Sequence, residues 1–382
     1  MDNIIKITSD ARFRLARSLM TSSGNDGGAT TTKSSSDETL EGAIDIFASL
    51  LEETRNTCGE TSLVAALCYY EYGNALFRAV VRRKPLDGDD DDNTQQHEED
   101  RKPAAKKPSD SAGRKRSLDD DDNTKESDRA SSDKKAKIEN NDEQENNDED
   151  DIALALEMLS TSFSIFDYCH STDDDDDNNT KTKPDEQEGK QYSLTQIPRV
   201  LTTIGDIHSH CGKFGDAVDA YCRALPYREK VWEERQQQQQ QQANKANKGE
   251  SLSVVEDLKC QRLVVETYAL IAEALLACKD GEDVVCANDE ENEEKDNSNV
   301  ATTAKKCNTK EGKVLVASKD RIDFAESHYE TAREKLQDIV YQMGKMAATK
   351  ANLGDEKKDI GYLVMMLVGI GNTLEPLKTK RS

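Results

Sequence analysis

The segment IGDIHSHCGKFGDAVDAYCRAL at residues 204–225 contains a dense group of potential metal ligands, His208, His210 and Cys211. Imidazole and thiolate are ligands that zinc prefers. Two residues separated by two positions on a helix point about 160° apart, so the two imidazole rings cannot share one ion if this segment is helical. We therefore expect no metal and no cofactor here. His208 is expected to pack against a partner helix, and His210 to lie on the helix surface.

No other pattern in the chain indicates catalysis. The sequence holds five histidines, and it lacks a glycine-rich phosphate loop, an H-E-x-x-H motif and a nucleophile elbow. The stretch CGKFGD has neither the spacing of a P-loop nor the serine or threonine that follows one. We expect a binding protein rather than an enzyme.

The charge of the chain limits its partners. In 382 residues, 76 acidic side chains against 52 basic ones give a net charge of −24, which repels nucleic-acid phosphates and favours a basic protein as partner. The longest apolar stretch, residues 361–371, is far shorter than the roughly 20 residues that span a bilayer. We expect no direct nucleic acid and no membrane as partner. Nine cysteines without a C-x-x-C pair favour reduced thiols inside the cell.

Apolar residues between the charged tracts recur at helical spacing, and the 34-residue tetratricopeptide period fits them. This repeat has two antiparallel helices, with a small residue at position 8 of the first helix and small, bulky and small residues at 20, 24 and 27 of the second. Counted from Pro198, these positions hold Gly205, Ala217, Tyr221 and Ala224. The segment at 204–225 is thus predicted to build a helical repeat.

Three more units fit the same register, each with an enlarged loop between its two helices. Gly73 stands at position 8 of a second unit that Ala155 continues, and Ala272 stands at position 8 of a fourth that Ala325 and Tyr329 continue. A first unit precedes them, and a helix at 355–375 is expected to cover the last repeat. The predicted fold class is all-α, a tetratricopeptide-repeat helical array of about four repeats plus a C-terminal capping helix. Its second repeat is interrupted by a long disordered acidic insertion.

Charged tracts set the expected domain organisation. Residues 86–150 contain 23 acidic and 12 basic side chains and few large apolar ones, so they are predicted to be disordered. The expected segments are 1–85 (first repeat and first helix of the second), 86–150 (acidic insertion with basic clusters), 151–232 (second helix of the second repeat and third repeat, with an acidic loop at 171–190), 233–257 (glutamine-rich linker), 258–345 (fourth repeat, with an acidic loop at 281–320) and 346–382 (capping helix and basic tail).

An acidic interruption inside the second repeat is the architecture of one known family. The order GETSLVAALCYYEYGNALF (59–77), acidic tract, LALEMLSTSFSIF (154–166) and RLVVETYALIAEAL (262–275) closely resembles the SHNi-TPR histone chaperones related to nuclear autoantigenic sperm protein. The resemblance covers roughly residues 40–85, 150–232 and 258–345. It implies binding of histones three and four, chiefly histone three, for histone supply and nucleosome assembly. The implied location is the nucleus, with shuttling to the cytoplasm.

The first helices of a tetratricopeptide array line its inner groove, and the resemblance assigns histone contacts there. Asp206 and Glu266 match acids of the family and are expected to contact the histone. Thr202, His210 and Glu273 occupy further groove positions. A flexible polyanion screens positive charge without a fixed geometry, so the acidic insertion is expected to assist the groove. The alternative for the insertion is a solubilising spacer.

A generic tetratricopeptide adaptor is the alternative function. Such adaptors bind C-terminal peptides of heat-shock chaperones through Lys, Asn and Arg side chains that hold a carboxylate. Asn74 and Arg78 partly match that clamp, whereas the groove acids favour a basic ligand. Linker histone is a further candidate partner, and the apolar ends of a helical array permit a homodimer.

Two basic clusters interrupt the acidic insertion and resemble a bipartite nuclear import signal, which an import receptor would bind. Charge balance within the insertion is the alternative explanation. The clusters are Arg114, Lys115 and Arg116, followed by Lys134, Lys135 and Lys137.

Overall fold

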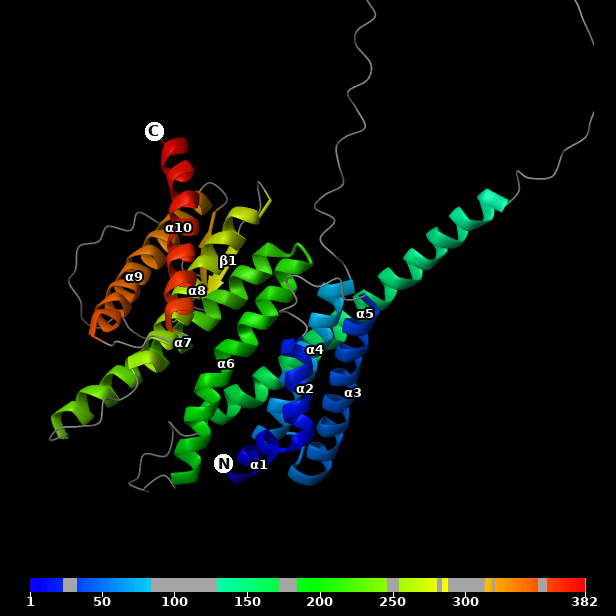
Figure 1. The fold of residues 1–382 in the computed structure, drawn as a ribbon, viewed down its shortest axis with the longest axis horizontal. Helices are drawn as coiled ribbons and strands as arrows, with labels where there is room; N and C mark the ends of the chain where they lie inside the picture. The colour runs from blue at the N-terminus through cyan, green and yellow to red at the C-terminus, as the bar shows by residue number, and fades with distance from the viewer. Residues whose placement is uncertain are drawn as a thin grey trace, which may run out of the picture.

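The computed structural model describes residues 1–22, 33–83, 129–171, 184–245, 254–279, 284–287, 313–317, 320–349 and 356–381. These residues form ten helices and one two-stranded sheet (Figure 1). The elements are α1 (Asp2–Ser9), α2 (Ala11–Ser22), α3 (Lys33–Cys58), α4 (Leu63–Arg83), α5 (Arg129–Ser171), α6 (Pro184–His210), α7 (Phe214–Lys245), α8 (Val254–Ala277), β1 (Val284–Ala287), β2 (Lys313–Val316), α9 (Arg321–Thr349) and α10 (Glu356–Arg381).

Tight turns join successive helices where glycine takes a left-handed conformation. Gly59 follows α3 with φ of 90°, and Gly212 follows α6 with φ of 70°. Lys213 N–H closes the end of α6 by donating to the His208 carbonyl at 2.8 Å, as in a helix C-cap. Ser62 caps α4 by accepting the Ala65 N–H at 3.2 Å. These local signals make α3–α4 and α6–α7 helical hairpins.

The helices α4 and α5 also form an antiparallel pair, although residues 84–128 separate them in the chain. The Ser162 hydroxyl donates to the Ala66 carbonyl at 2.8 Å near one end of the pair. Arg83 contacts Asp148 at 3.0 Å near the other end. At Gly73 the helices approach so closely that a Cβ atom would lie 3.0 Å from Leu159 Cγ. Side-chain packing thus joins the two halves of the pair across the interruption.

The small residues that the repeat register selects lie at contacts between helices. A Cβ atom at Gly205 would lie 2.3 Å from Cε1 of Tyr221 on α7, so only glycine allows this approach of α6 to α7. All nine positions that the register singles out are buried: Gly73, Ala155, Gly205, Ala217, Tyr221, Ala224, Ala272, Ala325 and Tyr329.

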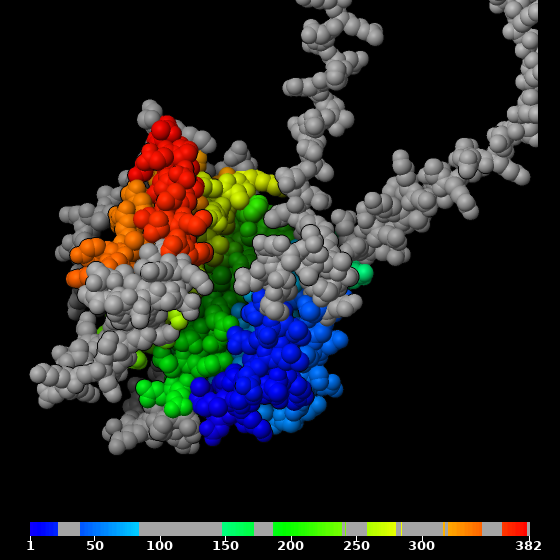
Figure 2. Space-filling view, in the orientation of Figure 1, coloured from blue at the N-terminus to red at the C-terminus, as the bar shows by residue number. Residues whose placement is uncertain are grey.

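Each helix from α2 to α10 packs on the next one along the chain, and this packing is consistent with a helical repeat array. The apolar side chains form two clusters, one centred on α1–α6 and the other on α7–α10. The helices α1–α3 and the helix α10 lie at opposite ends of the helical body, with α6 and α7 between them (Figure 2).

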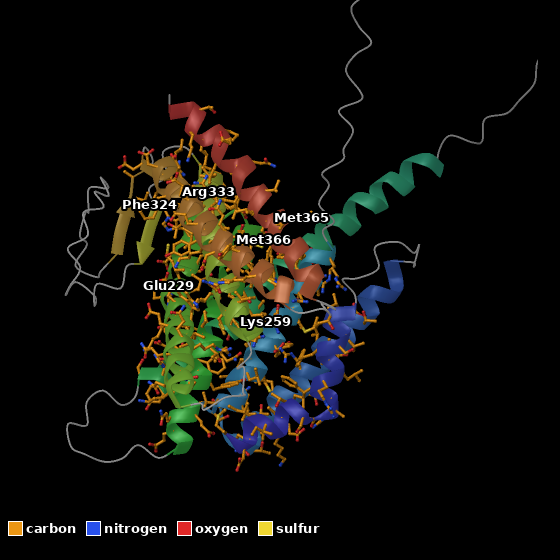
Figure 3. All side chains as sticks on the ribbon, turned by 60° about the vertical axis from the view of Figure 1, so that its left-hand side comes forward. Glu229, Lys259, Phe324, Arg333, Met365 and Met366 are labelled. Carbon is orange, nitrogen blue, oxygen red and sulfur yellow. The ribbon has the colours of Figure 1, made fainter. Side chains whose placement is uncertain are left out.

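Helix α10 covers the C-terminal end of the body by packing on α9. Leu363, Ile370 and Leu374 on α10 are buried, whereas Met365 is 75% exposed (Figure 3). One face of α10 therefore packs inward and the other faces outward.

The predicted helical fold class is confirmed for the described residues, apart from one small antiparallel sheet. Strands β1 and β2 pair Val284 with Val316 and both residues are buried. They lie within the predicted acidic loop at 281–320. The β-branched runs VVCA and KVLV favour extended structure, and β1 packs on α7, so a local apolar pattern prevails over the acidic composition around it.

Helix boundaries differ from the predicted segments in three places. Helix α5 already begins at Arg129, inside the insertion predicted to be disordered, and α6 begins at Pro184, inside the predicted acidic loop at 171–190. Helix α7 continues to Lys245, into the predicted glutamine-rich linker. Adding residues to a packed helix avoids the cost of helix nucleation, and Glu, Gln and Lys are good helix formers. Polar composition alone therefore misplaced these boundaries.

Among the residues that the structure describes, one helical segment, Asn147–Ser171 of α5, is long and apolar enough to cross a membrane by length and composition alone. A single such segment is weak evidence, because core helices of soluble proteins have the same length and composition. Ala155, Leu159 and Phe166 in this segment are fully buried among the other helices.

Candidate binding surface for a charged partner

Alternate helices lie side by side and bring charged side chains together. Arg17 of α2 is 3.2 Å from Glu71 of α4, and Arg199 of α6 lies over the ring of Tyr70 on α4. Arg228 of α7 bridges α6 and α8, because it donates to the Thr202 hydroxyl at 2.9 Å and to the Leu263 carbonyl. We refer to the surface that α2, α4, α6 and α8 form as the even-helix face.

Asp206 lies on α6, one of the helices of this face. Its carboxylate accepts a hydrogen bond from the Tyr221 hydroxyl at 2.8 Å. Burial raises the pKa of Asp206, although the Tyr221 hydrogen bond and the nearby charge of Arg228 act in the opposite direction. Asp206, which the sequence predicts to contact a histone, thus already forms a hydrogen bond within the protein.

Arg228 is a buried cation that sequence reasoning missed. It is 9% exposed, and burial lowers its pKa against the attraction of Glu266 and Asp206. Besides Thr202 it contacts the Thr267 hydroxyl. Arg228 therefore neutralises part of the charge of Asp206 and Glu266 from inside. In the sequence it looks like one more charged residue of a helix, and no local signal predicts its burial.

The other predicted contact residues are more accessible. Glu266 accepts a hydrogen bond from Arg262 Nε at 2.7 Å and keeps 24% of its side chain exposed. Glu273 is exposed, and partial burial raises its pKa. His210 is exposed and its ring lies edge-on to Phe77 at 5.8 Å. Asp206, Glu266 and Glu273 together make the α6–α8 end of the even-helix face acidic.

The histidines of the opening segment lie apart. His208 is half-buried, 3.9 Å from Asp216, whereas His210 faces α4 through Phe77. Within the described ranges, no group of three His, Cys, Asp or Glu side chains could hold a metal ion.

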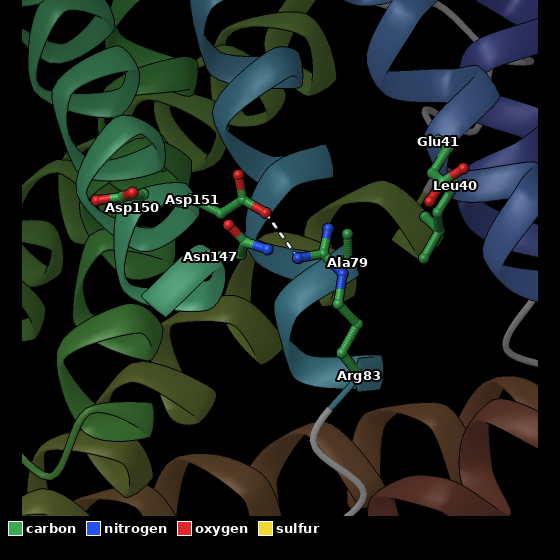
Figure 4. Close-up of a pocket in the computed structure, with 7 residues that line it drawn as sticks. All are labelled: Leu40, Glu41, Ala79, Arg83, Asn147, Asp150 and Asp151. Carbon is green, nitrogen blue, oxygen red and sulfur yellow. Dashed lines mark hydrogen bonds and ion pairs between the residues drawn. The ribbon is translucent and has the colours of Figure 1, made fainter. Parts of the chain in front are cut away.

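A second acidic site lies where α4 ends and the well-packed part of α5 begins (Figure 4). It is a pocket of about 540 Å³ lined by Leu40, Glu41, Ala79, Arg83, Asn147, Asp150 and Asp151. Arg83 is 2.7 Å from Asp151 and 3.0 Å from the buried Asp148. Arg83 thus pairs with two carboxylates, and Glu41 and Asp150 add two more acidic side chains to the pocket lining. Sequence reasoning missed this pocket because it treated residues 148–150 as part of the disordered insertion.

Only part of the predicted import signal lies among the described residues. Arg114, Lys115 and Arg116 lie outside the described residues, and Lys134, Lys135 and Lys137 fall in the first part of α5.

No protein-family model matches the chain, and a search of curated proteins finds no match. The functional proposal therefore rests on the acidic pocket at Arg83 and on the charged side chains of the even-helix face.

Proposed function

We propose that the chain is a histone chaperone of the SHNi-TPR type, whose helix pairs α1/α2–α3, α4–α5, α6–α7 and α8–α9 are tetratricopeptide repeats. It binds histones three and four, chiefly histone three, for histone supply and nucleosome assembly in the nucleus. Its role is binding rather than catalysis. The observation that carries this proposal is the acidic pocket between α3, α4 and α5, where Asp148 and Asp151 pair with Arg83 and Glu41 and Asp150 lie unpaired with it in the lining.

The position of this pocket connects it to the acid-rich insertion. Arg83, which pairs with the pocket acids, is the last residue of α4 before the interruption at 84–128. Residues 86–150 hold 23 acidic and 12 basic side chains. A fixed acidic pocket beside an acid-rich segment suits a guest with dense positive charge, because the pocket gives a defined contact and the segment adds screening. Both features favour a histone.

The even-helix face supplies a second contact in this proposal. Glu266 and Glu273 on α8 and Asp206 on α6 present carboxylates there. Each exposed ion pair contributes only about 0–1 kcal/mol, so affinity for the histone arises from several contacts acting together.

Charge variants of the pocket test the proposal. In the full chain, Glu41→Gln with Asp150→Asn removes two pocket charges and spares Asp151, which pairs with Arg83. We expect histone H3–H4 binding, followed by fluorescence anisotropy, to weaken about 5- to 20-fold at about 0.1 M salt. The loss should shrink at higher salt because screening weakens these charges.

The matched control is Glu157→Gln with Glu334→Gln, two exposed acids on α5 and α9 that do not line the pocket. If both double variants lost the same histone affinity, net charge alone would explain the loss, and the pocket would have no part in binding. Undetectable histone binding by the unmodified chain would refute the function itself. The alternative, an adaptor for C-terminal peptides of heat-shock chaperones, instead requires a carboxylate-binding site.

A further inference from the structure

One lysine of α9 lies on aromatic rings rather than beside a carboxylate. The Nζ atom of Lys335 is 5.0 Å from the centre of the Trp232 ring on α7 and 5.8 Å from the centre of the Tyr268 ring on α8. Both distances fall within the roughly 6 Å over which a ring face attracts a cation. Two ring faces from different helices therefore meet at one ammonium group, and we call Trp232 and Tyr268 the ring site.

The ammonium group of Lys335 has no carboxylate within ion-pair distance among the residues that the structure describes. Glu334, beside it in the chain, is exposed, and Asp338, three positions further along α9, accepts a hydrogen bond from Gln342 at 2.7 Å. The chain offers 76 acidic side chains. A lysine that lies on two rings without an ion pair indicates that the ring faces themselves attract a cation.

A hydrogen bond and ring packing hold the Tyr268 ring in place. Its hydroxyl donates to Glu229 Oε1 at 2.9 Å. Its ring centre lies 5.6 Å from that of His328, which lies 4.7 Å from that of Phe324. Burial lowers the pKa of His328 to about 4, so this imidazole is neutral at pH 7 and does not repel a cation. Glu229 on α7 and Phe324 on α9 thus border a pre-formed site (Figure 3).

The ring site can be reached from solvent, because Trp232, Tyr268 and Lys335 are each half-buried. A lysine ammonium is strongly hydrated. A trimethylated ammonium keeps the positive charge, is more weakly hydrated and contacts a ring face through its methyl groups. Aromatic cages accordingly bind quaternary ammonium ligands. Such a group from outside the chain therefore competes well with Lys335 for the two ring faces.

We propose that the ring site binds the trimethylammonium group of a ligand, either a trimethylated lysine in a peptide or a free quaternary amine. Lys335 occupies the site in the free protein and moves aside when the ligand binds. Trp232 and Tyr268 contact the cation, and Glu229 adds negative charge beside the rings. None of these residues lines the pocket at Arg83, so the ring site does not depend on histone binding.

Three fluorescein-labelled peptides test this assignment on the full chain by anisotropy. Each is a short peptide of Gly and Ser with one central residue, which is trimethyllysine, unmodified lysine or a neutral tert-butyl analogue of the same shape as trimethyllysine. We expect the trimethyllysine peptide to bind about 5-fold more tightly than the other two. Trp232→Leu should remove this preference. Lys335→Ala vacates the ring faces and should bind the trimethyllysine peptide about 3- to 10-fold more tightly than the unmodified chain.

Tyr341→Leu and Lys378→Ala are the matched controls. Tyr341 is an exposed ring on the same helix as Lys335, and Lys378 pairs with Glu330 at 2.8 Å. Both variants should leave peptide binding unchanged. A gain in affinity cannot result from misfolding, so Lys335→Ala remains informative if Trp232→Leu lowers the thermal midpoint. Equal affinity for trimethyllysine and the neutral analogue, or no gain in Lys335→Ala, would overturn the proposal.

The emission of Trp232 distinguishes the two sources of the ligand, because this is the only tryptophan in the chain. Tetramethylammonium chloride should change the emission at concentrations at which potassium chloride does not. A change at lower concentrations of the trimethyllysine peptide, without its label, would identify a lysine side chain as the ligand. The reverse order would assign the ring site to a free quaternary amine. No change with either compound would overturn the site itself.

Discussion

Both ends of the even-helix face contain arginines and carboxylates, but the carboxylate is buried at one end and the arginine at the other. At the α2–α4 end, the carboxylate of Glu71 is buried and Arg17 and Arg78 reach solvent. At the α6–α8 end, the guanidinium of Arg228 is buried and the carboxylate of Glu273 reaches solvent. The buried charge at each end is opposite in sign to its accessible neighbours.

This difference shows how a chain with a strong net charge can offer both signs on one surface. A buried charge partly neutralises its neighbours and restricts where they lie. The accessible side chains then determine which ligand binds. The α2–α4 end presents guanidinium groups, and the α6–α8 end presents carboxylates.

The largest expected effect comes from breaking the helix contact beside Asp206. Gly205→Ala places a Cβ atom 2.3 Å from Tyr221 Cε1, so α6 and α7 must separate. We expect a loss of about 2–3 kcal/mol in the free energy of unfolding, measured with urea.

Gly344→Ala is the control for this variant, because a Cβ atom there meets nothing within 4 Å. It should stabilise α9 by up to about 1 kcal/mol, since alanine favours helices over glycine. Equal effects of the two substitutions would mean that the approach at Gly205 is not tight.

A slightly smaller effect is expected from removing the buried cation. Arg228→Leu leaves the Thr202 and Thr267 hydroxyls without this partner and Asp206 without a nearby positive charge. We expect a loss of about 2 kcal/mol in unfolding free energy. Arg223→Leu, at an exposed arginine, should cost less than about 1 kcal/mol. If Arg228→Leu left the free energy of unfolding unchanged, the buried cation would not organise the α6–α8 end.

Removing accessible acids should affect binding more than stability. Asp206→Asn with Glu266→Gln keeps oxygen acceptors for Tyr221 and Arg262 but removes two negative charges. We expect histone affinity to fall about 3- to 10-fold at low salt, measured by anisotropy. Glu334→Gln, an exposed acid on α9, should have no such effect. A similar loss in the control would make the α6–α8 end no more important than any other acidic surface.

The smallest effect concerns pH. Because burial raises the pKa of Asp206 in the folded protein, the folded state binds this proton more tightly than the unfolded state. Its contribution to stability is therefore present at acidic pH and is lost as pH rises through the folded pKa. Asp206→Asn should gain stability relative to the unmodified chain between about pH 3.5 and 7. Urea midpoints across this range test the sign, and a relative loss would contradict it.

Local spacing predicted the helix contacts because they depend on residue size. Gly205 and Tyr221 meet because one repeat register places a small residue opposite a bulky one. The burial of Glu71 and Arg228 could not be predicted in this way, because it depends on neighbours from other helices. Likewise, residues 148–150 belong by composition to the acidic insertion. Their role in a pocket arises only because Arg83 reaches them from α4.

The most direct test is the affinity for histone H3–H4 at low and high salt, measured by fluorescence anisotropy with two double variants of the full chain. The Asp206→Asn/Glu266→Gln variant, which removes two carboxylates, is predicted to lose affinity at low salt. The Arg78→Gln/Arg199→Gln variant, which removes two guanidinium groups, is predicted to retain histone binding. Equal losses in both variants, or no loss in either, would contradict an even-helix face with two ends of opposite charge.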